Sequence, residues 1–281
     1  MRDMMDNGRA ARAVGFLLGL ANEETVERVR ARIDLPGAEH PEAIRQRLAR
    51  PWLWAGRLPA SVALWILEED DPRLTSMVWR YLTDIGLRRA VCRGVPFGPG
   101  RTEPRPAPES LAGQEPEVPD SYVRHGLVGA LRLATAMGTA RAAASMVLTR
   151  DDWRTVAEAD AERALPGYAR WALSVRPDCP PTLRARFGSH PKFTHRLRQA
   201  GVFDSPADYA LAEGPAVHVL DLLSLGHAAF PNRSRAAEDA LRPLVRDHLG
   251  RREEAWAVLA QLVETFHGTT PELVMTAGAI A

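Results

Sequence analysis

Apolar residues recur with helical spacing along most of this 281-residue chain, and they constrain its fold more than any other feature of the sequence. Segment 74–85 carries apolar residues at positions i, i+3, i+4, i+7, i+8 and i+11, which form one stripe on a helix. Shorter stripes run through 62–66 and 256–266. Strand-like alternation of apolar and polar residues and two-residue hairpin turns are both absent. The pattern predicts an all-α chain.

Many of the 22 prolines stand where a helix is expected to begin. Proline suits the first helical position because the N–H that it lacks would have no partner inside the helix. Asp71, Ser205 and Thr270 each precede such a proline and are expected to cap the following helix. We therefore expect short helices, of about 9–17 residues, joined by tight turns. The prolines in question are Pro41, Pro59, Pro72, Pro166, Pro181, Pro191, Pro206 and Pro271.

Composition excludes several classes of protein. The formal net charge is +1, whereas a dedicated nucleic-acid-binding protein is usually far more basic. Cys92 and Cys179 lie far apart, without a second Cys or a His at ligand spacing, so neither a disulfide framework nor a Cys-based zinc site is expected. Two lone thiols are typical of a reducing cytosol, which predicts a cytoplasmic protein.

No membrane contact is expected. The most apolar stretch, residues 126–148, contains Arg132 and Arg141, and each would cost about 2.5–3.5 kcal/mol at the centre of a bilayer. The first twenty residues also lack the basic start and the small-residue cleavage site of a secretory signal.

One segment interrupts the helical rhythm. Residues 96–118 are dense in proline, and glycines lie at their start, which predicts a flexible or polyproline-like linker. We therefore expect an N-terminal helical segment at 1–95, the linker at 96–118 and a C-terminal helical-repeat segment at 119–281.

Two stretches of the chain resemble each other. Asp71-Pro72-Arg73-Leu74-Thr75 and His190-Pro191-Lys192-Phe193-Thr194 both place a basic residue, an apolar residue and Thr after proline, and a short proline-initiated helix precedes each. The pattern resembles HEAT-like repeats, and more closely the leucine-rich repeat variant, over roughly 52–84 and 150–200. The resemblance implies stacked short helix pairs in an α-solenoid-like fold, without the cysteine cluster that an iron–sulfur centre needs. The whole chain also looks like hypothetical proteins of high-GC actinobacteria.

The sequence has no motif that identifies catalytic, cofactor-binding or metal-binding residues. The acidic run at 68–71 could serve acid–base chemistry, but it spans a helix end and the next cap, where we expect Asp71 to act structurally. Asp151 and Asp152 follow Thr149 at another helix start and receive the same interpretation. The eight histidines lack the i, i+4 pairing of an HExxH zinc motif.

A basic cluster with interleaved aromatic residues lies at 184–198 and could bind phosphates or an acidic protein segment, or could simply be a solvated face. Trp79 lies off the stripe of its helix, beside Arg80, and could be either an exposed binding anchor or packed against the next helix pair. The possible binding surface comprises Trp79, Arg80, Arg184, Arg186, Lys192, His195, Arg196 and Arg198.

These observations favour a non-catalytic scaffold that binds a protein or peptide, because stacked helix pairs present extended surfaces and seldom enclose a reactive pocket. Two alternatives remain open. One is a nucleic-acid-binding repeat protein with an Arg-rich face that would also draw on Arg132 and Arg141. The other is a helical enzyme with a pocket between its two halves.

Overall fold

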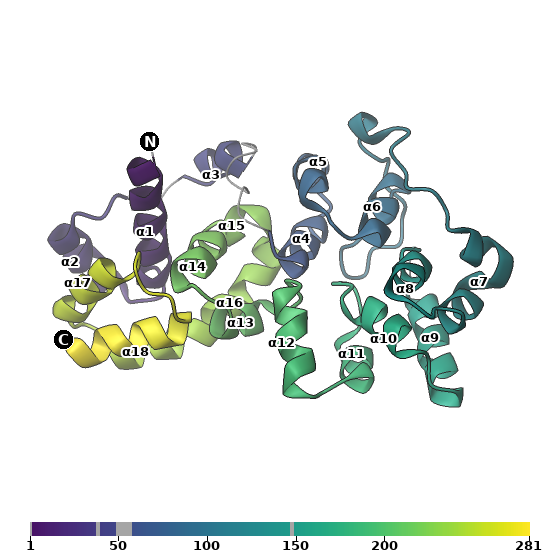
Figure 1. The fold of residues 1–281 in the computed structure, drawn as a ribbon. Coiled ribbons are helices and arrows are strands. Elements are labelled where there is room, and N and C mark those ends of the chain that lie inside the picture. Colours follow the sequence, from purple (N-terminus) through teal and green to yellow (C-terminus); the bar gives the residue numbers. More distant parts are fainter. Residues whose placement is uncertain (1, 38–39, 49–57, 147–148) are drawn as a thin grey trace. The chain divides into compact units, whose positions relative to one another are not determined.

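The computed structural model describes residues 2–37, 40–48, 58–146 and 149–281, and within these ranges it contains helices and no strand. Short helices pack against one another in a solenoid-like manner, so the predicted all-α fold of stacked helices is confirmed (Figure 1). No helix within these ranges is both long enough and apolar enough to cross a bilayer.

The chain divides into two compact units, of which unit 1 combines residues 1–50 with residues 204–281. The most extensive helix–helix packing in it is between α1 and α14, so the first helix and a segment about 200 residues later share one core (Figure 1). Its helices are α1 (Arg2–Leu18), α2 (Glu23–Ile33), α3 (Pro41–Leu48), α13 (Pro206–Ala212), α14 (Ala216–Ser224), α15 (Gly226–Ala229), α16 (Pro231–Leu244), α17 (Glu253–Leu262) and α18 (Thr270–Ile280), with one π-helical turn η4 (Val245–Leu249).

Unit 2 comprises residues 51–203. An apolar cluster in this unit is formed by helices α7 to α11, with Trp153 and Phe187 among its buried side chains. Its helices are α4 (Ala60–Leu67), α5 (Pro72–Val78), α6 (Ile85–Cys92), α7 (Asp120–Arg132), α8 (Met137–Ala144), α9 (Arg150–Glu162), α10 (Gly167–Ser174), α11 (Pro181–Phe187) and α12 (Pro191–Gln199), with 3₁₀ turns η2 (Trp79–Tyr81) and η3 (Glu109–Leu111).

The predicted helix starts are confirmed at most prolines. Helices α3, α5, α11, α12 and α13 begin at a proline, and Pro59 and Pro166 occupy the position just before α4 and α10. The Asp71 and Ser205 side chains accept backbone hydrogen bonds from the first turns of α5 and α13, as expected of caps. For α18 the prediction was wrong by one residue, because Thr269 rather than Thr270 caps the helix and forms a capping box with Glu272.

The apolar stripe at 74–85 does not lie on one helix. Helix α5 ends at Val78, a 3₁₀ turn follows, and α6 starts at Ile85. The break has a local cause, since the Asp84 carboxylate accepts a hydrogen bond from the Leu87 N–H at 2.8 Å and so caps a new helix. Likewise α17 ends at Leu262, before the end of the predicted stripe at 266.

The two units do not follow the expected boundaries at 95 and 119. Residues 96–118 lie inside unit 2, and the start of this segment is hydrogen-bonded to the turn after α4. The buried Asp70 carboxylate accepts hydrogen bonds from the backbone N–H groups of Phe97 and Gly98, at 3.0 and 3.1 Å, and from Arg101 at 2.8 Å. Proline density predicted a linker because it ignores such long-range hydrogen bonds, which here hold the segment to the end of α4.

Candidate functional site

Two members of the predicted binding surface are buried. Trp79 is only 8% exposed, its indole N–H donates to Gln114 at 3.3 Å, and the Arg88 guanidinium lies over its ring. Trp79 therefore packs inside unit 2, which was the second of the two interpretations that its position allowed. Arg184 is 4% exposed and donates to the carbonyl oxygens of Ser174, Arg176 and Cys179.

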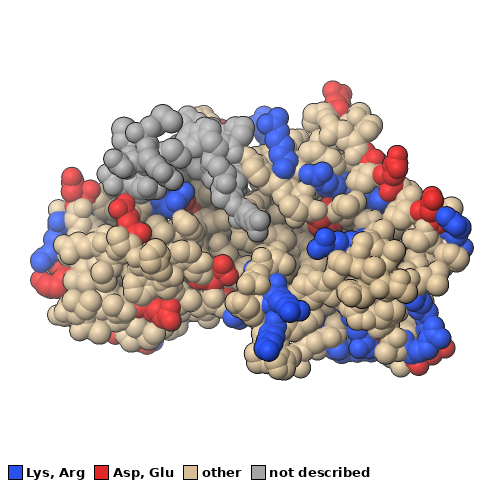
Figure 2. All heavy atoms as spheres, in the orientation of Figure 1, with Lys and Arg blue, Asp and Glu red and all other residues tan. Residues whose placement is uncertain are grey.

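Three of the predicted residues do lie together. Lys192, His195 and Arg196 are exposed and occupy positions i, i+3 and i+4 on one side of α12. Figure 2 shows Lys and Arg side chains gathered over this helix.

The remaining three predicted residues stand apart from this group. Arg80 is exposed on η2. Arg186 on α11 donates to the Ala157 carbonyl oxygen at 3.4 Å, and its charge helps to lower the pKa of Asp160. Arg198 is half-buried on a different side of α12.

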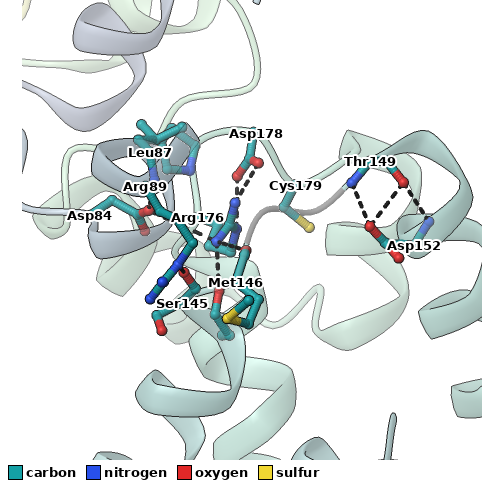
Figure 3. Close-up of polar contacts among 12 residues, drawn as sticks. Asp84, Leu87, Arg89, Ser145, Met146, Thr149, Asp152, Arg176, Asp178 and Cys179 are labelled. Atoms are coloured by element: carbon teal, nitrogen blue, oxygen red, sulfur yellow. Dashed lines mark hydrogen bonds and ion pairs between the residues drawn. The ribbon is translucent and has the colours of Figure 1, made fainter. Parts of the chain in front are cut away.

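Arg176 is the centre of a buried polar network in unit 2 (Figure 3). Its guanidinium forms two hydrogen bonds with the Asp178 carboxylate, at 2.9 and 2.6 Å, and donates to the carbonyl oxygens of Ala144 and Met146. Gly86 permits this arrangement, because a Cβ atom there would lie 1.9 Å from a guanidinium nitrogen. The network joins α6, the end of α8 and the turn after α10.

The charges in this network compensate one another. Burial alone would lower the pKa of Arg176, but the carboxylates of Asp178 and Asp84 outweigh it, so the pKa is raised and the guanidinium stays charged. Burial raises the pKa of Asp84 above its ordinary value, although the Arg176 charge opposes that shift. The Trp153 ring lies 5.8 Å from the guanidinium and adds a cation–π contact.

A second buried arginine, Arg89, has the same kind of partners. It donates to the carbonyl oxygens of Ser145, Pro116 and Glu117, at 3.2, 2.8 and 3.0 Å. Burial lowers its pKa, and the nearby Arg93 adds to the effect. The buried arginines thus satisfy carbonyl groups at helix ends and in turns, which is a structural role.

A pocket of about 470 Å³ lies in unit 1 against α1, and we call it the α1 pocket. Its volume falls within the range of about 300–1,000 Å³ that is usual for ligand pockets. Small residues on one side of α1 leave this space open, since a Cβ atom at Gly15 would meet only a Leu35 methyl group, at 3.9 Å. The lining comprises Gly8, Ala11, Arg12, Gly15, Phe16, Gly19 and Leu20 of α1 and its end, with Arg30, Pro36, Gly37, Ile44, Ser224, His227 and Glu238.

Charged groups line this mostly apolar pocket. The side chain of Glu238 is 15% exposed, and its Oε1 atom is buried without a hydrogen bond from any described residue. His227 Nε2 lies 3.4 Å from that oxygen, within ion-pair distance but not aligned for a hydrogen bond. Within the described ranges, Arg12 uses Nε to bind Asp221 at 2.6 Å, and Arg30 uses one terminal nitrogen to bind the Pro36 carbonyl at 2.9 Å.

Ser224, His227 and Glu238 line the same pocket, which raises the question of a nucleophilic site. The Ser224 hydroxyl donates to the Asp221 carbonyl oxygen at 2.6 Å, and no hydrogen bond joins it to His227 in the described structure. An activated serine needs a base within hydrogen-bond reach, and the Ser224 hydroxyl is instead engaged by a backbone carbonyl among the described residues.

Sequence reasoning missed the α1 pocket. The signal was present, because Gly8, Ala11, Gly15 and Gly19 recur at i, i+3, i+7 and i+11 and place small residues along one side of α1 and its end. The partner helices that turn this side into a pocket are distant in sequence and cannot be identified from local patterns. Neither Glu238 nor His227 belongs to a sequence motif that would identify it as a pocket residue.

The described residues contain no group of three or more His, Cys, Asp or Glu side chains that could hold a metal ion. No family model matches the chain, and comparisons with curated proteins and with solved structures also found no match.

Proposed function

We propose that this chain is a cytoplasmic helical-repeat protein of the HEAT-like type that binds a short apolar peptide segment of a partner protein. The α1 pocket is the observation that carries the proposal, since it offers an apolar floor of small residues next to a few polar groups. The proline-initiated helix pairs support the repeat class, and two cysteines that form no disulfide support the reducing compartment.

The polar groups of the pocket favour a peptide over a lipid chain. Glu238 Oε1 lacks a hydrogen-bond donor, whereas Arg12 and Arg30 have N–H groups that the described contacts leave unused. A peptide backbone supplies an N–H donor and a carbonyl acceptor at every residue, so one ligand satisfies both needs. Glycines on α1 would let that backbone approach closely.

Peptide selection on phage, with the full-length protein immobilised, tests the proposal. We expect the selected peptides to share apolar residues and to lose at least tenfold in affinity for Gly15→Leu, about 1.4 kcal/mol, because the new side chain would enter the pocket. Gly138→Leu is the matched control, since Gly138 lies on an exposed side of α8 with nothing described within 4 Å of its Cβ position.

Selected peptides that bind wild type and Gly15→Leu equally well would overturn the proposal, as would a selection that enriches no peptide. Circular dichroism of Gly15→Leu and Gly138→Leu checks that both variants keep the helix content of the wild type, so that a loss of binding can be distinguished from a loss of folding.

A further inference from the structure

Helix α12 carries two cations, Lys192 and Arg196, on its solvent side, and we call Lys192, His195, Arg196 and Gln199 the α12 face. These residues stand at i, i+3, i+4 and i+7, so they follow one another along a single side of the helix. All four are exposed. Leu197 and the half-buried Phe193 lie on the opposite side, toward the core.

The cations of the α12 face, Lys192 and Arg196, lack acidic partners, which distinguishes them from only part of the exposed arginines in this protein. Among the described residues, no ion pair or side-chain hydrogen bond engages the charged groups of Lys192 or Arg196. By contrast, Arg124 pairs with Asp120 at 3.5 Å and Arg154 with Asp151 at 2.8 Å. The sequence explains the difference, since no Asp or Glu occurs between Asp178 and Asp204.

The positions of Lys192 and Arg196 are electrostatically unfavourable for α12 when no ligand is bound. Lys192 stands in the first turn of α12, next to the positive end of the helix dipole, and that turn contains no acidic residue. Lys192 and Arg196 are also like charges at i and i+4, which repel each other. A bound polyanion would offset both the unfavourable interaction of Lys192 with the helix dipole and the repulsion between Lys192 and Arg196.

The surroundings of the α12 face favour phosphate over a protein surface. Residues 179–203 expose no large apolar side chain, although a protein interface needs apolar or aromatic anchors at its centre. They do expose hydroxyl and amide groups on Ser189 and Gln199, which are usual contacts of phosphate oxygens. Phe193 packs edge-on against Trp171, with ring centroids 5.5 Å apart, and is therefore not available for stacking on a base.

We propose that the α12 face binds the phosphate backbone of double-stranded nucleic acid without reading its sequence. Unit 2 as a whole supports such contact, because it contains 21 Lys and Arg against 16 Asp and Glu, whereas the entire chain is nearly neutral. The near-neutral net charge of the chain thus conceals a basic unit.

Fluorescence anisotropy with a short labelled DNA duplex, titrated across a series of salt concentrations, tests this proposal on the full-length protein. Counterion release makes the logarithm of the affinity fall linearly with the logarithm of salt concentration, by about 0.9 for each phosphate contact. The double variant Lys192→Gln/Arg196→Gln is therefore expected to bind more weakly at low salt and to reduce that slope by about 1.8. A duplex of scrambled sequence should bind wild type equally well.

The matched control is Arg124→Gln/Arg154→Gln, which removes the same charge from exposed positions of unit 2 on α7 and α9. The proposal requires this control to keep the wild-type slope. Equal losses in the two double variants would refute it, because the effect would then follow net charge alone. Absence of DNA binding at low salt, with salt-dependent binding of a labelled poly-glutamate peptide that the α12 variant abolishes, would assign the face to an acidic protein instead.

Discussion

Units 1 and 2 are built from the same kind of short helix, yet different interactions stabilise the interior of each unit. The core of unit 1 is almost wholly apolar, with Leu17, Phe230 and Trp256 fully buried. Unit 2 buries three arginines, Arg89, Arg176 and Arg184, which bridge carbonyl groups of successive helices and turns. Their charges differ as well, because unit 1 has 15 Lys and Arg against 19 Asp and Glu, whereas unit 2 has a basic excess.

The difference shows how one architecture can present two kinds of surface. In unit 1, small residues on α1 leave an apolar pocket open. In unit 2, many turn carbonyls are satisfied from inside by arginine side chains, and the exposed side of α12 carries cations without acidic partners. Substitutions in each unit test whether its stability depends on buried arginines or on apolar packing.

Arg176→Met should have the largest effect. Removing the guanidinium leaves Asp178 and the carbonyls of Ala144 and Met146 without their partner, and breaking a buried ion pair costs about 3–5 kcal/mol. Urea unfolding measures the loss, and hydrogen exchange locates it in residues 51–203. A change below about 1 kcal/mol would show that unit 2 does not depend on its buried arginines.

Leu17→Ala is the counterpart in unit 1. Leu17 is fully buried on α1, so truncation leaves a cavity and should lower the free energy of unfolding by about 2–5 kcal/mol. Urea unfolding is again the measurement, with hydrogen exchange expected to increase in α1 and α14. A neutral outcome would contradict the packing of these two helices.

Asp160→Asn should cost about 2 kcal/mol near neutral pH, since a charge-assisted pair is lost. Burial of Asp160 alone would raise the pKa of its carboxyl, but hydrogen bonds from Arg170 and the Leu165 N–H outweigh it, and the pKa lies below its ordinary value. Because the folded-state pKa is depressed, this contribution is present above the unfolded-state pKa and is lost as pH falls through the folded-state pKa.

The stability difference between wild type and Asp160→Asn should therefore be constant above about pH 5 and shrink below about pH 4, around the ordinary aspartate pKa. Thermal melts across this pH range check the prediction. A difference that grows on acidification would mean that Asp160 is destabilised when charged.

Gly15→Ala should have the smallest effect, and it should stabilise the protein. Glycine inside a helix costs about 0.5–1 kcal/mol relative to alanine, and the added Cβ atom has room in the α1 pocket. Thermal unfolding measures the gain. Destabilisation would show that this side of α1 is closely packed and that the pocket is not open in solution.

Local signals in the sequence predicted much of this fold. Proline and the caps Asp71 and Ser205 identified helix starts because these effects act within a few residues. The apolar stripe at 74–85 wrongly predicted one continuous helix, because apolar periodicity does not reveal that Asp84 caps a new helix. The pairing of α1 with α14, the packing of segment 96–118 on Asp70 and the burial of Arg184 all depend on long-range contacts, which local patterns do not encode.

The candidate sites divide in the same way. The cations of the α12 face were predicted because they are close together in sequence, whereas the α1 pocket needed residues from α1, α2, α3 and α14 to α16. Trp79 was ambiguous for a similar reason, since its burial depends on Gln114 and Arg88.

Hydrogen-exchange mass spectrometry of the full-length protein shows whether the two units bind different kinds of ligand. A peptide selected on the wild-type protein is expected to slow exchange in α1 and in residues 224–238, and a DNA duplex is expected to slow exchange in residues 190–199. Protection of the same segments by both ligands, or protection of neither region, would contradict this expectation.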